Sequence, residues 1–163
     1  MTENKVKLFF NKLDYLKNSS DRIAIRAQLV KKFLGPIKNV TILDIGCGDG
    51  SLSLPFLGAG NQLTLNDISE NMIEVVQKRI PLEFKNDVTL INDSFEAVKG
   101  GKQFDVILCV GVIAHVPNVK QLFETLGGLL KPGGQLILET TPNPCIKMSA
   151  KLYCPKSSRS RIK

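Results

Sequence analysis

Short apolar segments alternate with amphipathic segments through most of the chain. The short segments are rich in Val, Ile and Leu, which is typical of strands buried in a parallel sheet. They lie at residues 40–45, 62–66, 88–91, 104–110 and 135–140. The segments with apolar residues at helical spacing lie at 3–17, 20–34, 51–57, 69–80 and 119–130. This alternation predicts one α/β domain with a doubly wound, mostly parallel sheet and helices on both faces.

Capping and turn residues mark several of the predicted boundaries. Ser20 is suited to cap the second helix, and Gly35 is suited to end it. The run K-P-G-G at 131–134 predicts a turn before the last strand. On the second helix, Arg22 and Arg26 are placed near the mouth of the expected site. A solvated position is favoured for both arginines, and contact with a ligand carboxylate is the alternative.

The segment V-T-I-L-D-I-G-C-G-D-G at 40–50 leads from a strand into three alternating glycines. Gly46, Gly48 and Gly50 remove side chains where the backbone turns sharply or where a ligand lies against the main chain. Their spacing differs from the dinucleotide-binding pattern G-x-G-x-x-G, because Ser51 stands at the third glycine position. The loop therefore favours a nucleoside over a pyrophosphate, and a tight turn without a ligand is the alternative.

Carboxylates directly follow the second and third predicted strands. Ligands of doubly wound sheets bind outside the carboxyl ends of the strands, so Asp67 is placed to accept hydrogen bonds from both hydroxyls of a ribose. The alternative for Asp67 is an acid at a helix N-terminus. Asp93 is placed to accept a hydrogen bond from an adenine amino group, with Ile68 or Phe95 against the ring.

The one histidine, His115, lies in the loop 111–117 after the fourth predicted strand. This loop faces the same crevice, and the unperturbed pKa of imidazole lies near neutrality. His115 is therefore the candidate catalytic base for an acceptor whose proton has a high pKa. A loop histidine that is hydrogen-bonded to the backbone is an equal alternative.

Positive charge is concentrated at the two ends of the 163-residue chain, whose net charge is +7. Residues 1–40 carry nine Lys or Arg against three acids, and residues 142–163 carry six against none. Residues 41–141 carry seven against twelve. Because the central part is mildly acidic, a nucleic-acid partner is not expected. The hydrophobic content of 43% is enough for one ordinary core.

Cysteine spacing and the N-terminal sequence bear on the compartment. Cys47, Cys109, Cys145 and Cys154 form no C-x-x-C pair and are expected to be free thiols in a reducing compartment. The charged N-terminus lacks the pattern of a signal peptide, and no apolar run approaches the roughly 20 residues of a membrane-spanning helix. The sequence therefore predicts a cytoplasmic protein without a membrane span.

Four longer segments follow one another in a defined order. They are L-D-I-G-C-G-D-G at 43–50, L-N-D-I-S at 65–69, F-D-V-I-L-C-V-G-V-I-A-H-V-P-N at 104–118 and L-L-K-P-G-G-Q-L-I-L-E at 129–139. Together they resemble the class I S-adenosylmethionine-dependent methyltransferases over roughly residues 20–150. The resemblance implies a Rossmann-like methyltransferase fold and S-adenosyl-L-methionine as the cofactor. It also implies methyl transfer to an O, N or C atom of a small metabolite.

The resemblance implies roles for individual residues. The methionine part of the cofactor is assigned to Asp44, Gly46, Cys47 and Gly48. The ribose is assigned to Asp67, the adenine to Ile68 and Asp93, and the methionine amino group to the backbone around Val110. The loop of His115 and the T-P-N run at 141–143 look most like methyltransferases of the ubiquinone and methyl-branched metabolite type. The neighbours of His115 are apolar rather than acidic, so no metal site is expected.

Two alternative functions stay open from the sequence. An NAD-dependent dehydrogenase shares the strand, the glycine loop and the second-strand acid, although the glycine spacing disfavours it. A non-catalytic S-adenosylmethionine-binding module that partners a full-length enzyme is the other alternative.

The predicted organisation has three parts. Residues 1–38 are expected to be N-terminal helices that form a lid, 39–141 the S-adenosylmethionine-binding domain, and 142–163 a basic tail that begins a truncated C-terminal part. Methyltransferases of this fold continue past the fifth strand, so this sheet is expected to lack the final antiparallel strands. The apolar segment 136–138 would then lie at an exposed edge, through which self-association is expected.

Overall fold

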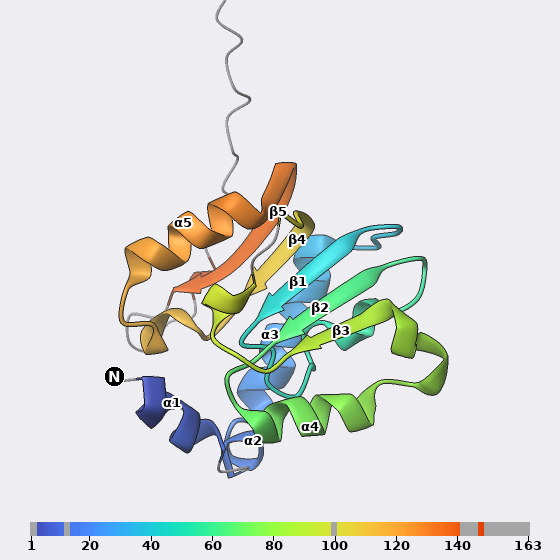
Figure 1. Ribbon diagram of the computed structural model, residues 1–163. Helices are drawn as coiled ribbons and strands as arrows, with labels where there is room; N and C mark the ends of the chain where they lie inside the picture. Colours follow the sequence, from blue (N-terminus) through green and yellow to red (C-terminus); the bar gives the residue numbers. More distant parts are fainter. Residues whose placement is uncertain (1–2, 12–13, 99–100, 141–146, 149–163) are drawn as a thin grey trace, which may run out of the picture.

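A single sheet organises the computed structural model, which describes residues 3–11, 14–98, 101–140 and 147–148 (Figure 1). The strand order within these residues is β3-β2-β1-β4-β5-β6. The strands are β1 (Thr41–Ile45), β2 (Gln62–Asn66), β3 (Val88–Ile91), β4 (Phe104–Cys109), β5 (Leu130–Thr140) and β6 (Lys147–Met148). The first five are parallel and β6 is antiparallel to β5. The predicted doubly wound α/β fold is confirmed.

Helices connect the strands and bury both faces of the sheet (Figure 1). The α-helices are α1 (Glu3–Phe10), α2 (Asp14–Asn18), α3 (Ser20–Leu34), α4 (Glu70–Arg79) and α5 (Val119–Leu129). Short 3-10 helices are η1 (Leu54–Phe56), η2 (Leu82–Asp87), η3 (Phe95–Ala97) and η4 (Ile113–His115). Val30 of α3 and Val76 of α4 pack on one face, whereas Leu122 and Leu126 of α5 pack on the other. Successive residues of β1 face alternate layers, so the strand is apolar on both sides.

The central strands end at one level and so form the floor of a crevice. Ile45, the last residue of β1, aligns with Asn66 of β2 on one side and with Cys109 of β4 on the other. Ile91 of β3 aligns with Asn66. The strand order reverses between β1 and β4, and such a switch point opens a ligand-binding crevice beyond the carboxyl ends of the strands.

The N-terminal helices differ from the prediction. The single helix expected over 3–17 is two helices, since α1 ends at Phe10 and α2 begins at Asp14. The N-cap of α3 is Ser19 rather than Ser20, and the Ser19 hydroxyl accepts a hydrogen bond from Arg22 at 3.0 Å instead of capping a backbone N–H. The predicted end of this helix is confirmed at Gly35, whose φ of +61° suits glycine.

The predicted turn at 131–134 is instead part of β5. Phe104 aligns with Leu130 and Val106 aligns with Gln135. Residues 131–134 therefore form a bulge opposite Asp105. Gly133, with a φ of +80°, and Gly134 supply the flexibility for the bulge, but pairing with β4 keeps the chain extended on both sides of it.

A short antiparallel strand was not expected. Glu139 aligns with Met148 and Thr140 with Lys147, so the end of β5 has a partner on its outer side. Among the described residues, the segment 136–138 has no second strand neighbour, and self-association through it stays a prediction. The T-P-N run, Cys145 and Cys154 lie outside the described residues, and Lys147 and Met148 are the described part of the basic tail. Within the described ranges, no helix is both long and apolar enough to cross a bilayer.

Candidate functional site

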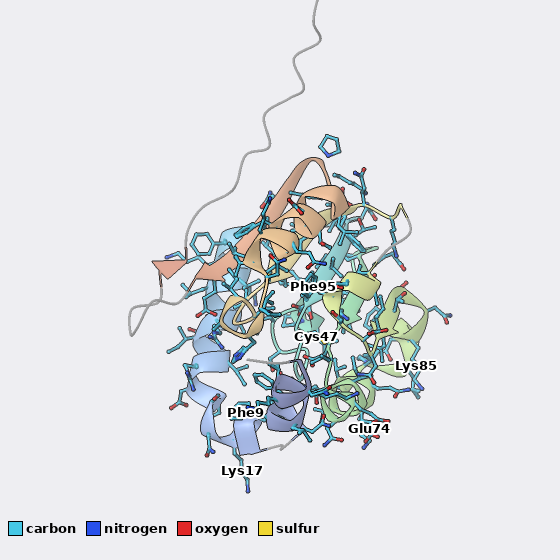
Figure 2. All side chains as sticks on the ribbon, turned by 60° about the vertical axis from the view of Figure 1, so that its left-hand side comes forward. Phe9, Lys17, Cys47, Glu74, Lys85 and Phe95 are labelled. Carbon is cyan, nitrogen blue, oxygen red and sulfur yellow. The ribbon has the colours of Figure 1, made fainter. Side chains whose placement is uncertain are left out.

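A pocket lies beyond the carboxyl ends of the strands, where the switch point predicts it. Its walls come from the loops after β1, β2, β3 and β4, and from the side chains of α1, α2 and α3. Eight of the nine site residues predicted from the sequence line it, namely Gly46, Cys47, Gly48, Asp67, Ile68, Asp93, Val110 and His115. Figure 2 shows Cys47 enclosed in the molecule, whereas Lys17 and Glu74 extend from its periphery.

The three positions after β1 that require glycine do so for different physical reasons. All have positive φ, at +67° for Gly46, +54° for Gly48 and +75° for Gly50. A Cβ at Gly46 would lie 2.5 Å from Cγ2 of Val112, and a Cβ at Gly50 would lie 2.5 Å from Cγ2 of Val76. A Cβ at Gly48 would meet no protein atom within 4 Å. Gly46 and Gly50 therefore allow close packing, whereas Gly48 keeps pocket space open.

Asp67 joins the end of β2 to the glycine loop. The side chain is only 8% exposed, and its Oδ2 accepts a hydrogen bond from the Gly48 N–H at 2.9 Å. Its Oδ1 accepts one from the Ser69 N–H at 2.9 Å. Burial raises the pKa of Asp67, and these backbone N–H groups oppose that rise. Each oxygen still has acceptor capacity toward the pocket, since a carboxylate oxygen has two lone pairs.

The helix N-terminal alternative for Asp67 does not describe this geometry. The N-cap of α4 is Ser69, whose hydroxyl accepts a hydrogen bond from the Met72 N–H at 3.3 Å. Asp67 lies two residues earlier, and one of its oxygens reaches across to Gly48. The carboxylate is therefore a wall of the pocket as well as a support for the following turn.

Asparagine side chains, which the sequence analysis missed, hold the neighbouring strand ends together. Asn66 Nδ2 donates to the carbonyl oxygen of Asp93 at 2.8 Å, and Asn92 Nδ2 donates to that of Asp67 at 3.1 Å. Asp93 itself is exposed, and its Oδ1 accepts from the Ser94 N–H at 2.7 Å. These bonds fix the spacing between Asp67 and Asp93 on one side of the pocket.

Asp44 is the one predicted site residue that the structure does not bring to the pocket wall. Only 1% of it is exposed, and its Oδ2 has no hydrogen-bond partner among the described residues. Burial raises the pKa of Asp44 to about 7, and the nearby carboxylates of Asp67 and Asp49 add to this rise. The assignment of Asp44 to the methionine part of a cofactor stays a prediction, because the residue is buried and does not line the pocket.

Cys47 lines the pocket as a neutral thiol rather than as a nucleophile. The residue is 4% exposed, and burial raises the pKa of its thiol well above the usual value. A nucleophilic cysteine requires a lowered pKa and access to solvent. The Cys47 N–H donates to the carbonyl oxygen of Asn66 at 3.0 Å, which ties the first turn of the loop to β2.

His115 is the last residue of η4, in the loop after β4, and lines the pocket. Its ring meets Phe10 of α1 edge-on, with the centroids 5.1 Å apart. Its Nδ1 is buried and has no hydrogen-bond partner in the part of the chain that the structure describes. Burial lowers the pKa of His115, and the positive charge of Arg26 lowers it further. The imidazole is therefore neutral at pH 7 and able to accept a proton.

The His115 pKa gives a direct prediction, because this is the only histidine in the chain. An NMR titration of its ring protons should show a midpoint below 6.5 in the folded protein and near 6.5 in denaturant. A lowered folded pKa means that the unfolded chain binds more protons just below pH 6.5, so this group reduces stability as the pH falls through that range. A folded midpoint at or above 6.5 would contradict the buried position.

Arg26 is not the solvated arginine that the sequence favoured. Its side chain is 11% exposed, lines the pocket and lies 2.8 Å from Oε2 of Glu139, whose side chain is 1% exposed. The same Nη2 atom donates to Oε1 of Glu139 at 3.0 Å. Sequence reasoning missed Glu139, although an acid that ends an apolar strand was the signal used for Asp67.

Arg79 of α4 was also missed, and it supports the glycine loop from outside. Its Nη1 donates to the Asp49 carbonyl oxygen at 2.7 Å, to the Asp49 carboxylate and to the Ser51 hydroxyl at 3.0 Å. These partners lie about 30 positions away in the sequence, and no local pattern links them. The loop is therefore held by α4 through Arg79 and by β2 through Asp67.

The N-terminal helices form one side of the pocket. Val6 and Phe10 of α1, Leu16 of α2 and Ile23 of α3 line it with apolar surface. Asn11, which follows α1, accepts a hydrogen bond through its Oδ1 from the Ser69 hydroxyl at 2.7 Å. In the described ranges, no group of three or more His, Cys, Asp or Glu side chains is arranged to hold a metal ion.

A family model described as a methyltransferase domain matches residues 43–136. The match covers more than half of the chain and includes the glycine loop, Asp67, His115 and most of β5. The chain belongs to this methyltransferase domain family.

Curated relatives share part of their length with this chain. The ubiquinone biosynthesis O-methyltransferase of Hydrogenovibrio crunogenus is 30% identical over 117 residues, which are 71% of this chain and 48% of that protein. The protein of the same name from Rickettsia felis is 34% identical over 104 residues, or 64% of this chain and 42% of the relative. The chain thus spans about half the length of the curated relatives it matches.

Solved structures of low sequence identity show the same fold. Magnesium protoporphyrin IX methyltransferase from Synechocystis, with bound SAM, has a TM-score of 0.69 and 24% identity over 86% of this chain and 76% of that chain. The glycopeptide N-methyltransferase MtfA, complexed with sinefungin, has a TM-score of 0.58 and 24% identity over 69% of this chain and 51% of that chain. The predicted Rossmann-like methyltransferase fold is confirmed.

Proposed function

We propose that this chain is an S-adenosylmethionine-dependent methyltransferase that acts on a small metabolite. The observation that carries the proposal is the pocket at the switch point, where the Asp67 carboxylate is bonded to the Gly48 N–H beside open space. The family membership of the chain agrees with this cofactor rather than with NAD. The spacing of the glycine loop also favours a nucleoside without a pyrophosphate.

The charges of the pocket suit S-adenosylmethionine, which carries a sulfonium, an ammonium and a carboxylate group. The acidic lining residues are Asp49, Asp67, Asp93 and Glu96. Among the described lining residues, Arg26 is the only Lys or Arg side chain. In the proposed arrangement, Asp67 holds the ribose hydroxyls, and Ile68 and Asp93 face the adenine. The backbone around Val110 receives the methionine amino group.

The acceptor side of the pocket is largely apolar. Val6, Phe10, Val112 and Val116 line the pocket together with His115, whose ring contacts Phe10. We propose an acceptor with an apolar body and one reactive group. When bound, S-adenosylmethionine supplies an electrophilic methyl group on its sulfonium. The chain's own residues orient the two reactants, and such orientation supplies about 7 to 11 kcal/mol of a barrier in well-aligned reactions.

His115 has the properties of a catalytic base for an O–H or N–H acceptor. The lowered pKa keeps the imidazole neutral at pH 7, and the edge contact with Phe10 limits the rotation of the ring. The base takes the acceptor proton as the acceptor atom attacks the methyl group, while the electron pair of the breaking bond returns to sulfur. An acceptor that is already an anion would react without this step.

Two finer predictions accompany the function. Both Cys47 and Cys109 are buried free thiols, which suits the reducing cytoplasm. Self-association through the outer side of β5 is proposed only for the segment 136–138, because the alignment with β6 covers Glu139 and Thr140.

Replacing Asp67 with alanine should weaken binding of S-adenosylhomocysteine by about 1.5 to 3 kcal/mol, the range for hydrogen bonds to a charged group. The loss has two sources, the ribose contacts and the hold on the Gly48 N–H. Isothermal titration calorimetry measures the effect. Asp87→Ala is the matched control. Asp87 accepts a hydrogen bond from Gln62 at the other end of β2 and does not line the pocket. Parent-like affinity in a folded Asp67→Ala protein would mean that the ribose assignment is wrong.

The activity itself is tested with S-adenosylmethionine that carries a labelled methyl group. The full chain is incubated with the labelled cofactor and a small-molecule extract, and the low-molecular-weight fraction is searched for the label. Transfer that is lost in a folded His115→Ala variant, with the affinity for S-adenosylhomocysteine retained, supports the proposal. Cofactor binding without transfer to any acceptor would favour a non-catalytic binding module instead.

A further inference from the structure

Arg26 and Glu139 form a buried ion pair at the edge of the pocket. Arg26 belongs to α3 and Glu139 to β5, and 113 positions separate them in the sequence. One guanidinium nitrogen, Nη2, makes both contacts to Glu139. Nε is buried without a hydrogen-bond partner among the described residues. Since a guanidinium has five N–H donors, Arg26 retains donors beyond those used by Glu139.

The guanidinium lies against the loop that follows β4. A Cβ at Gly111 would be 3.2 Å from Nη1 and 3.3 Å from Nη2 of Arg26. Gly111 has a φ of +76° and directly follows Val110, whose backbone is assigned to the methionine amino group. In an amino acid the carboxylate is attached to the same carbon as the amino group. A ligand amino group at Val110 therefore places a carboxylate within reach of Arg26.

We propose that Glu139 is a positioning residue that holds the Arg26 guanidinium at Gly111, where it distinguishes ligands with an amino-acid carboxylate from ligands without one. This inference rests on the proposed function. Glu139 does not line the pocket, so it acts through Arg26. Its carboxylate also compensates the charge of Arg26 in the buried position, which would otherwise be strongly unfavourable.

A comparison of two ligands tests the proposal. S-adenosylhomocysteine has the amino-acid part, whereas 5′-methylthioadenosine keeps the adenosine and the sulfur but lacks that part. Glu139→Ala should lower the affinity for S-adenosylhomocysteine about 10-fold or more, in line with the loss of a charged hydrogen bond. The affinity for 5′-methylthioadenosine should change by less than about twofold, because its contacts lie at Asp67, Ile68 and Asp93.

Two further variants separate positioning from general stability. Glu139→Gln keeps an oxygen acceptor for Nη2, so the parent preference for S-adenosylhomocysteine should be retained even if Glu139→Ala does not fold. Asp105→Ala is the structural control, because it breaks the 2.8 Å pair with Lys131 of β5 outside the pocket. It should destabilise the protein and leave the ratio of the two affinities unchanged.

The ratio of the two affinities decides the outcome. If Glu139→Ala leaves this ratio unchanged, whether or not both affinities fall, the positioning role is overturned and the ion pair is only structural. Loss of the ratio in Glu139→Gln would overturn it as well. A parent chain that binds neither ligand would instead contradict the proposed function, and this inference with it.

Discussion

Replacing Gly48 with valine should abolish binding of S-adenosylhomocysteine while the protein stays folded. Gly48 lines the pocket, and a Cβ there would meet no protein atom within 4 Å. The added side chain would therefore occupy the space that the ligand needs. The Gly48 N–H also donates to Asp67, so any shift of the loop would disturb the proposed ribose site. Calorimetry with the folded variant measures the effect.

The control for this substitution must also place a side chain at a positive φ. Gly35 has a φ of +61° against +54° for Gly48, and its Cβ would also meet nothing within 4 Å. Gly35 ends α3 and does not line the pocket. Both variants should lose stability, because residues with a side chain rarely adopt a positive φ. Gly35→Val should retain binding, and retained binding in Gly48→Val would show that the ligand does not lie over the glycine loop.

Replacing Asp44 with asparagine should remove a fall in stability between pH 5 and pH 8. Burial raises the folded pKa of Asp44 from 3.8 to about 7. In the unfolded chain this carboxyl group is ionised at both pH values, whereas in the folded chain it is protonated at pH 5 and ionised at pH 8. The folded state thus binds more protons, and its stability falls as the pH rises toward 7 and beyond. Linkage gives a fall of about 2 to 3 kcal/mol from this group.

Denaturant unfolding of the parent and the variant at both pH values measures this difference. Asp67 also has a raised pKa and contributes in the same direction, but it is present in both proteins. Asp105→Asn is the matched control. Burial alone would raise the pKa of Asp105, but Lys131 and Thr41 lower it below 3.8, so the group stays ionised from pH 5 to pH 8. A pH dependence in Asp44→Asn equal to that of the parent would contradict the buried, raised-pKa carboxyl group.

The sequence predicts which strand ends contribute residues to the pocket, for a topological reason. Apolar strands followed by Gly46, Asp67 and Asp93 need only a parallel sheet to come together, because parallel strands end at one edge. The position of His115 follows from the same rule. Asp44 shows the limit of this rule, since it lies inside β1, one residue before the end of the strand, and is buried.

Contacts between elements that are distant in the chain could not be predicted from the sequence. The pairing of Arg26 with Glu139 depends on how α3 lies across the sheet, which no local pattern sets. The K-P-G-G run has the composition of a turn, and only its alignment with β4 makes it a bulge. The break between α1 and α2 lacks the glycine or proline that usually marks a helix end.

Calorimetric titration of the full chain with S-adenosylhomocysteine, and separately with NAD, distinguishes a methyl-donor nucleoside from a dinucleotide as the ligand of the pocket. We expect saturable binding of S-adenosylhomocysteine to one site, lost in Gly48→Val and weakened in Asp67→Ala. We expect no heat of binding with NAD. Binding of NAD alone would contradict the assignment of the pocket to a methyl-donor nucleoside.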